Sequence, residues 1–182
     1  LNAGFLKAKE LLEWWGQDLT NDGKLISQNA VLNGKTFTNN KDWSISDHLT
    51  VKVSQLINVG SVDLDRVDFQ KVIALLNGGE LTIRNTALGY IESFINNSNF
   101  SMGGRAKVEG QTFVNNGKSI FENDSDLTFS KSFENNHLLE LQSDFSLNGN
   151  RLHQSQNGSI RGAGRVKLQI NSLQNNGLIG AN

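Results

Sequence analysis

Hydrophobic and polar residues alternate along this chain in short runs that recur at a nearly constant spacing. In most repeats an Asn has an apolar residue two positions before it and a Gly two positions after it. Successive Asn residues are 18–20 residues apart, and the last interval of 40 residues holds two repeats, with a degenerate one near Gln154 to Gly158. The series is Asn2, Asn21, Asn39, Asn58, Asn77, Asn96, Asn115, Asn135 and Asn175. Such a period predicts a solenoid of stacked coils.

Within each repeat the alternation has a period of two residues, which is typical of strands with one buried face. Apolar residues stand four and six positions after the Asn with a mostly polar residue between them, as in Trp43-Ser-Ile45, and a second run such as Leu49-Thr-Val51 follows. We therefore expect an all-β parallel β-helix of about nine 19-residue coils, with three short strands per coil. Helical spacing occurs only near Leu6 to Glu13, so a short helical or irregular segment is allowed from Phe5 to Trp15.

The recurring Gly and Asn residues have structural explanations. The glycines are Gly4, Gly23, Gly60, Gly79, Gly117 and Gly177. At a corner between strands we expect positive φ at these positions, and a small strain where Lys41, Ser98 and His137 replace Gly. The Asn residues are expected to form a ladder in which each side-chain amide bonds to the next, because an unpaired amide in a semi-buried place costs about 1–3 kcal/mol.

Composition narrows the class of protein. The chain has 182 residues, a net charge of −1 and a pI near 6.3, which gives no basis for a nucleic-acid partner. It has no Cys, so disulfides and thiolate sites are excluded, and no apolar run is long enough to span a bilayer. Because Leu1 falls inside a repeat, we interpret residues 1–182 as a single β-helix segment of a longer filamentous protein.

Residues that could perform catalysis or bind metal are few. Asp63, Asp65 and Asp68 form the densest acidic group, which we interpret as a solvated patch, with Asp65 and Arg84 as a surface ion pair. His48, His137 and His153 are several coils apart, which disfavours a shared metal site. We therefore expect no catalytic residues, no metal site and no cofactor, and predict that the chain is not an enzyme.

Two places depart from the repeat and are candidates for binding. Trp14 and Trp15 are adjacent, so on a strand one of them should lie outside the core, where it would be an anchor for a protein or sugar partner. The interpretation favoured here is that both pack beneath an irregular N-terminal segment. The second place is Leu152 to Gly164, since insertions in a repeat mark loops that can bind.

The repeat resembles those of the filamentous haemagglutinin family. The likeness rests on Asn2-Ala-Gly4-Phe-Leu6-Lys-Ala8 and Asn175-Asn-Gly177-Leu-Ile179-Gly-Ala181, and the period, Asn and Gly positions extend it over the whole chain. Interior coils depart from the motif, since Asn58-Val-Gly60-Ser-Val62-Asp-Leu64 lacks the final Ala. The family comprises large exoproteins of two-partner secretion systems, including adhesins and contact-dependent growth inhibition effectors of Gram-negative bacteria.

This resemblance implies a right-handed β-helix that is secreted through an outer-membrane transporter and displayed at the bacterial cell surface. It also implies a role as filament stalk or as an adhesive or receptor-binding surface, with an outer-membrane protein or a glycan on a target cell as partner. Two other functions stay open: a β-helix polysaccharide lyase or glycosidase, and a phage tail fibre or autotransporter passenger.

Overall fold

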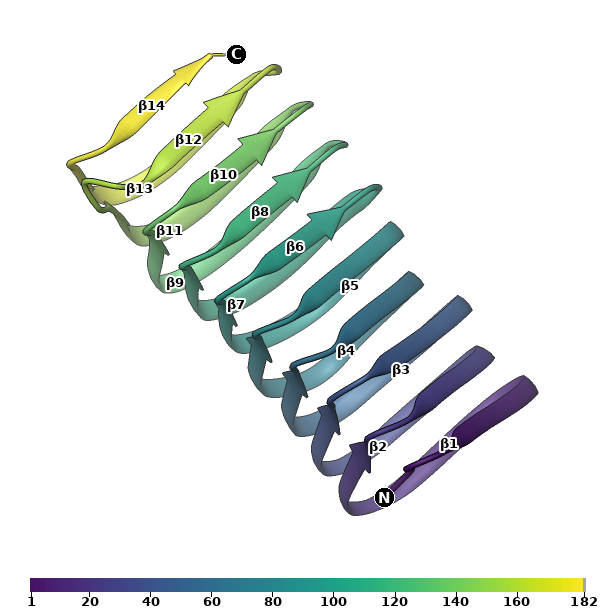
Figure 1. Ribbon diagram of the computed structural model, residues 1–182. Helices are drawn as coiled ribbons and strands as arrows, with labels where there is room; N and C mark the ends of the chain where they lie inside the picture. The colour runs from purple at the N-terminus through teal and green to yellow at the C-terminus, as the bar shows by residue number, and fades with distance from the viewer. Residues whose placement is uncertain (182) are drawn as a thin grey trace.

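The computed structural model describes residues 1–181, which form a stack of parallel coils with the two termini at opposite ends (Figure 1). These residues contain 14 strands and no helix. The strands are β1 (Phe5–Asn21), β2 (Lys24–Asn39), β3 (Asp42–Asn58), β4 (Ser61–Asn77), β5 (Glu80–Asn96), β6 (Asn99–Met102), β7 (Arg105–Asn115), β8 (Lys118–Phe121), β9 (Ser125–Asn135), β10 (Leu138–Leu141), β11 (Phe145–Gln154), β12 (Ser159–Gly162), β13 (Val166–Asn175) and β14 (Leu178–Ala181). The predicted all-β solenoid is confirmed.

Each coil pairs in parallel with the coils before and after it, at a spacing close to 19 residues. From β1 to β5 the order in space is the order in sequence; beyond β5 one path runs β6-β8-β10-β12-β14 and the other β7-β9-β11-β13. The strands are longer than expected, because β1 to β5 each continue through the corners for 16–17 residues. Later coils have one strand of four residues and one of 10–11, separated at polar or glycine-rich corners such as Gly103-Gly104.

The segment from Phe5 to Trp15 is not a helical excursion. It belongs to β1 and pairs in parallel with β2, with one register shift between Ala8 and Leu11. Within the segment, Leu12 and Trp14 pack against the core while Trp15 faces out. The apolar spacing that suggested a helix therefore arises from a strand whose pairing is interrupted once.

The core is a continuous apolar column inside the coils. Aromatic rings are in contact from coil to coil: Phe94 meets Phe113 edge to face with centroids 4.9 Å apart, and Phe113 stacks on Phe133 with centroids 4.6 Å apart. Trp43 packs against Phe37 at 4.6 Å and is fully buried. Because neighbouring coils share these contacts, the stability of each coil depends on its neighbours.

A ladder of Asn side chains runs beside this core. Each amide Nδ2 donates to the Oδ1 of the next coil, from Asn2 to Asn21, Asn39, Asn58, Asn77, Asn96, Asn115 and Asn135, at 2.7–3.0 Å. The same amides also donate to a backbone oxygen of the next coil, as from Asn58 to Glu80 O at 2.9 Å. The interior members from Asn21 to Asn135 are buried, so the ladder satisfies a line of amides that water does not reach.

Gln154 takes the ladder position in the degenerate repeat. It is fully buried and pairs in register with Asn135 and Asn175. Its Nε2 donates to Gly158 O at 3.1 Å, but its Oε1 has no hydrogen-bond partner. The longer side chain thus occupies the place of an Asn without continuing the chain of amide bonds.

The repeated glycines are required by close backbone approach and not by positive φ. A Cβ at Gly23, Gly60, Gly79, Gly117 or Gly177 would lie 1.9–2.2 Å from a backbone oxygen of the preceding coil, whereas one at Gly4 would meet nothing within 4 Å. Over residues 1–181 the only positive φ belongs to Gly89. The prediction of positive φ at the corner glycines was therefore wrong. The prediction of strain at Lys41, Ser98 and His137 was wrong for the same reason, since none of the three has positive φ.

Candidate functional site

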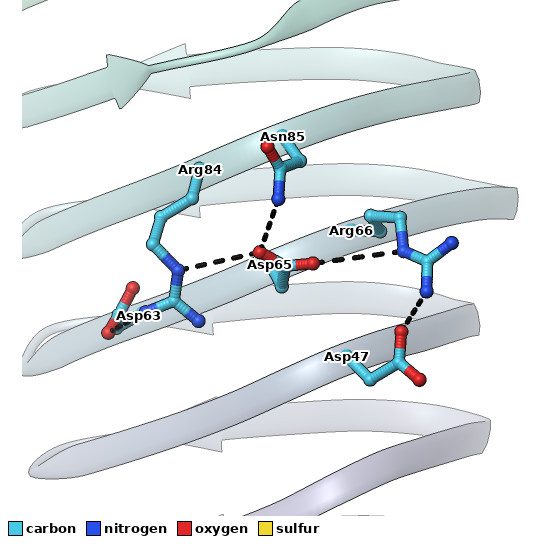
Figure 2. Close-up of polar contacts among 6 residues, drawn as sticks. All are labelled: Asp47, Asp63, Asp65, Arg66, Arg84 and Asn85. Atoms are coloured by element: carbon cyan, nitrogen blue, oxygen red, sulfur yellow. Dashed lines mark hydrogen bonds and ion pairs between the residues drawn. The ribbon is translucent and has the colours of Figure 1, made fainter.

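A network of charged side chains lies on the outer surface of the third to fifth coils (Figure 2). Asp65 is its centre. Its Oδ1 accepts a hydrogen bond from Asn85 Nδ2 at 2.6 Å and lies 3.6 Å from Arg84 Nε. Its Oδ2 lies 3.7 Å from Arg66 Nε. The predicted pairing of Asp65 with Arg84 is therefore confirmed, within a larger network.

Two further carboxylates complete the network. Arg84 Nη1 donates to Asp63 Oδ2 at 2.6 Å, and Arg66 Nη2 donates to Asp47 Oδ1. Each guanidinium therefore joins two carboxylates, and Asp63 and Asp65 are held by the same Arg84 (Figure 2). These side chains are 20–50% exposed, so each ion pair stabilises the fold by about 1 kcal/mol or less.

The network forms because the fourth coil is one residue short at this corner. Between the paired positions on either side, β4 has only Asp65, whereas β5 has Arg84 and Asn85. On the other side, β3 has Ser46 and Asp47 at the same place. The single residue of β4 is therefore flanked by two residues from each neighbouring coil, and one of these, Arg84, brings a positive charge to the Asp65 carboxylate.

The fourth coil regains its length further along, where a groove opens. There two residues of β4, Gln70 and Lys71, lie opposite one residue of β5, Tyr90. This two-to-one pairing is a β-bulge, which changes the direction of nearby side chains. The groove has a volume of about 480 Å³. It is lined by Asp68, Phe69, Gln70, Leu88, Gly89, Tyr90, Lys107 and Glu109. We call it the Tyr90 groove.

Asp68 lines this groove and forms no hydrogen bond or ion pair with the network around Asp65 in the part of the chain that the structure describes. It accepts a hydrogen bond from Gln70 Nε2 at 3.4 Å. The acidic group seen in the sequence is thus divided between two surfaces. Asp63 and Asp65 pair with arginines, while Asp68 lines a groove that has both apolar and polar side chains. Among the residues described, no group of three metal-binding side chains is close enough to hold an ion.

The tryptophans and histidines singled out in the sequence lie outside the Asp65 network and the Tyr90 groove. Trp15 is 67% exposed, whereas Trp14 packs against the core with its ring over Gly34, so the interpretation that both tryptophans pack inside was wrong. His48 lies on β3, His153 on β11 and His137 at a corner between β9 and β10.

The stretch from Leu152 to Gly164 keeps the architecture of the repeat. Leu152 and Ile160 are in the core, and the departure is a turn over residues 155–158. The break in the sequence motif therefore reflects a changed ladder residue and a longer turn, while the coil around them is retained.

A second charged surface surrounds Asp124 on the later coils. Its Oδ1 accepts hydrogen bonds from Ser143 Oγ at 2.5 Å and from the Asp144 backbone N at 3.2 Å. These bonds, with a weaker contribution from the Arg105 charge, lower the pKa of Asp124 below its ordinary value of 3.8. This carboxylate therefore joins two neighbouring coils, which is a structural role.

Sequence reasoning missed the Tyr90 groove. Tyr90 is the single Tyr of the chain and follows Leu-Gly, which interrupts the expected alternation, but neither feature showed that Gln70 and Lys107 would stand beside it.

Among the described residues no helix is long and apolar enough to span a membrane.

No family model, curated protein or solved structure matches this chain. The likeness to filamentous haemagglutinin repeats accordingly stays a prediction from the motif.

Proposed function

We propose that this chain is a β-helical segment of a secreted bacterial exoprotein of the filamentous haemagglutinin kind, in which the stack of coils presents a receptor-binding surface to a target cell. The observation that carries the proposal is the contrast between the two sides of the coils. Inside, the Asn ladder and apolar columns repeat from coil to coil. Outside, equivalent positions differ, as in the column Ser44, Asp63, Thr82 and Ser101.

A constant interior with a variable exterior suits a scaffold that holds particular side chains at fixed places. A stalk alone needs only the repeat. The Asp65 network and the Tyr90 groove both arise where the fourth coil departs from the register of its neighbours. Such bulges are over-represented next to functional sites, which favours recognition on this part of the surface.

The proposed setting follows from the same resemblance. The segment would pass an outer-membrane transporter during export and remain at the cell surface. There it would contact an outer-membrane protein or a glycan on a target cell, in adhesion or in contact-dependent growth inhibition. A role as plain stalk is the alternative within this proposal.

Polysaccharide cleavage is the main competing function, and the charged network gives little support for it. Glycosidases use two carboxyl groups on either side of the scissile bond, one of which must donate a proton. Here the Asp63 and Asp65 carboxylates are both ion-paired with the same Arg84, an arrangement that joins neighbouring coils. We therefore propose a binding role for this surface and not a catalytic one.

A phage tail fibre or autotransporter passenger would share the fold, and a trimeric state in solution would favour the tail fibre.

The test is binding of the fluorescently labelled chain to a panel of Gram-negative bacteria and animal cells, measured over a range of concentrations. We expect saturable binding to at least one cell type that excess unlabelled chain displaces. Heat-unfolded chain is the control. Binding that stays linear on every cell type would leave only the stalk role. Release of reducing ends from bacterial polysaccharides, lost on Asp65→Asn, would instead support an enzyme.

A further inference from the structure

The Tyr90 groove presents two short rows of outward side chains across three strands. One row is Asp68, Leu88 and Lys107, which pair in register on β4, β5 and β7. The second row has Tyr90 beside Glu109 on β7, with Gln70 on β4 facing Tyr90 across the bulge. Leu88 and Tyr90 are 44% and 39% exposed, so an apolar centre is flanked on both sides by polar groups.

The floor of the groove is backbone at Gly89. This residue has φ +113°, which disfavours any other residue, and a Cβ here would lie 2.1 Å from Phe69 O. A side chain at Gly89 would clash with the backbone of Phe69, so glycine is required between Leu88 and Tyr90.

The polar side chains around the apolar centre are available to a ligand. Gln70 donates to Asp68 at 3.4 Å, a long contact. Within the part of the chain that the structure describes, no hydrogen bond or ion pair engages the side chains of Tyr90, Lys107 or Glu109. Two carboxylates, one amide, one ammonium and one phenol therefore face a common space without a strong partner.

The strands that form the groove leave no free edge for a peptide strand, and the volume of the groove is compatible with a small ligand. A volume of about 480 Å³ belongs to the range of small-molecule sites, about 300–1,000 Å³. A peptide added as a strand needs an unpaired sheet edge. Here β4, β5 and β7 each pair on both sides, so their backbone donors and acceptors are already used.

The charge of the groove disfavours an acidic ligand. Asp68 and Glu109 outnumber Lys107, and no arginine lines the groove, whereas phosphate and carboxylate ligands are recognised by clusters of basic groups. The ligand should instead have an apolar face to lie against Tyr90 and Leu88, and a rim of groups that both donate and accept hydrogen bonds. A pyranose ring has both: C–H groups on its face and hydroxyls on its rim.

We propose that the Tyr90 groove binds a neutral oligosaccharide, with a sugar ring stacked on Tyr90 and Leu88. Gln70, Asp68 and Glu109 bond its hydroxyls. This inference rests on the proposed receptor-binding function, because it names the chemical class of the ligand for that surface. A longer glycan would run along the axis of the stack, since the two rows cross three successive coils.

The test is an array of immobilised neutral and acidic oligosaccharides probed with the labelled full chain. Tyr90→Ala removes the stacking surface. Ile73→Ala is the matched control, since Ile73 is 44% exposed, close to the 39% of Tyr90, but lies outside the groove. We expect the wild type and Ile73→Ala to bind the same neutral oligosaccharides, and Tyr90→Ala to bind them at least about tenfold more weakly. Unchanged circular dichroism and thermal midpoint would show that the variant folds.

A second measurement uses the wild type alone and so does not depend on the variant. Titration with the best oligosaccharide of the array should shift the backbone amide resonances of Gly89, Tyr90 and Lys107 in a saturable way. The proposal is overturned if no neutral oligosaccharide binds, if only acidic ones bind, or if the shifts map elsewhere. Equal binding of the wild type and Tyr90→Ala to cells would refute this groove while leaving the proposed function intact.

Discussion

Asn77 donates a side-chain hydrogen bond to Asn96 Oδ1 at 2.8 Å, and both side chains are fully buried. The same Asn77 accepts from Asn58, so it is one step in a line of amides that runs beside an apolar core. Each amide in this line depends on the next coil for its partner, so the loss of one affects its neighbours.

Removing one interior amide should therefore destabilise the fold. Asn77→Ala leaves neighbouring buried groups unpaired, and we expect a loss of about 2–3 kcal/mol in the free energy of unfolding. The measurement is urea unfolding followed by circular dichroism. Asn97→Ala is the control, because Asn97 accepts from Asn116 in an exposed position and should change stability by about 0.5 kcal/mol or less. Equal losses in the two variants would refute a special role for the buried ladder.

Two adjacent glycines test the close approach of the coils. A Cβ at Gly79 would lie 2.0 Å from Gly60 O, whereas a Cβ at Gly78 would meet only Asn58 O at 3.6 Å. Gly79→Ala should therefore lower the free energy of unfolding by about 2–3 kcal/mol, since backbone must move to admit the methyl group. Gly78→Ala should leave thermal and urea midpoints nearly unchanged. A similar effect of both substitutions would show that the coils are further apart than described.

Gln154 is a position at which a substitution should raise the stability of the fold. Its Oε1 is buried without a partner, which costs about 1–3 kcal/mol. Gln154→Asn would extend the amide ladder between Asn135 and Asn175, and we expect a higher thermal midpoint. Gln156→Asn, on the exposed turn, is the matched control. A lower midpoint for Gln154→Asn would mean that the wider turn over residues 155–158 requires the longer side chain.

Acid should weaken the contact between the coils at Asp124. The Ser143 hydroxyl, the Asp144 backbone N–H and then the Arg105 charge lower the pKa of Asp124 in the folded state. Its contribution is therefore present above the ordinary pKa of 3.8 and is lost as the pH falls through the lowered value. Wild type should exceed Asp124→Asn in urea midpoint at pH 6, and the difference should vanish near pH 2. A constant difference at all pH values would contradict this role.

The interior of the solenoid was predictable because it repeats. Each buried column, from Phe37 to Phe133 and from Trp43 to Leu139, follows from a fixed distance to the ladder Asn. Period-two alternation also decides which side chains face inwards, and the interpretation that Trp14 and Trp15 both pack inside was wrong because the alternation continues through this segment. The resulting parallel stacking follows once the coils are in register.

The exterior was less predictable, because it depends on small register shifts between coils. A spacing of 19 residues from Asn58 to Asn77 and again from Asn77 to Asn96 does not reveal that β4 is one residue short at Asp65 and regains it at Gln70. Alternation alone therefore placed Asp65 opposite Arg84 but not beside Asn85. The corner glycines were recognised, yet their cause is a contact between coils, which a single repeat does not show.

The inward ladder supports the fold, and we propose that the outer surface at Tyr90 performs recognition. The most direct test is saturation binding of labelled wild type and Tyr90→Ala to the same intact cells, in one flow-cytometry experiment. If the Tyr90 groove binds the target cell, wild-type binding is saturable and Tyr90→Ala binds at least about tenfold more weakly, with equal thermal midpoints. Saturable binding of equal strength by both chains, or no saturable binding by the wild type, would contradict it.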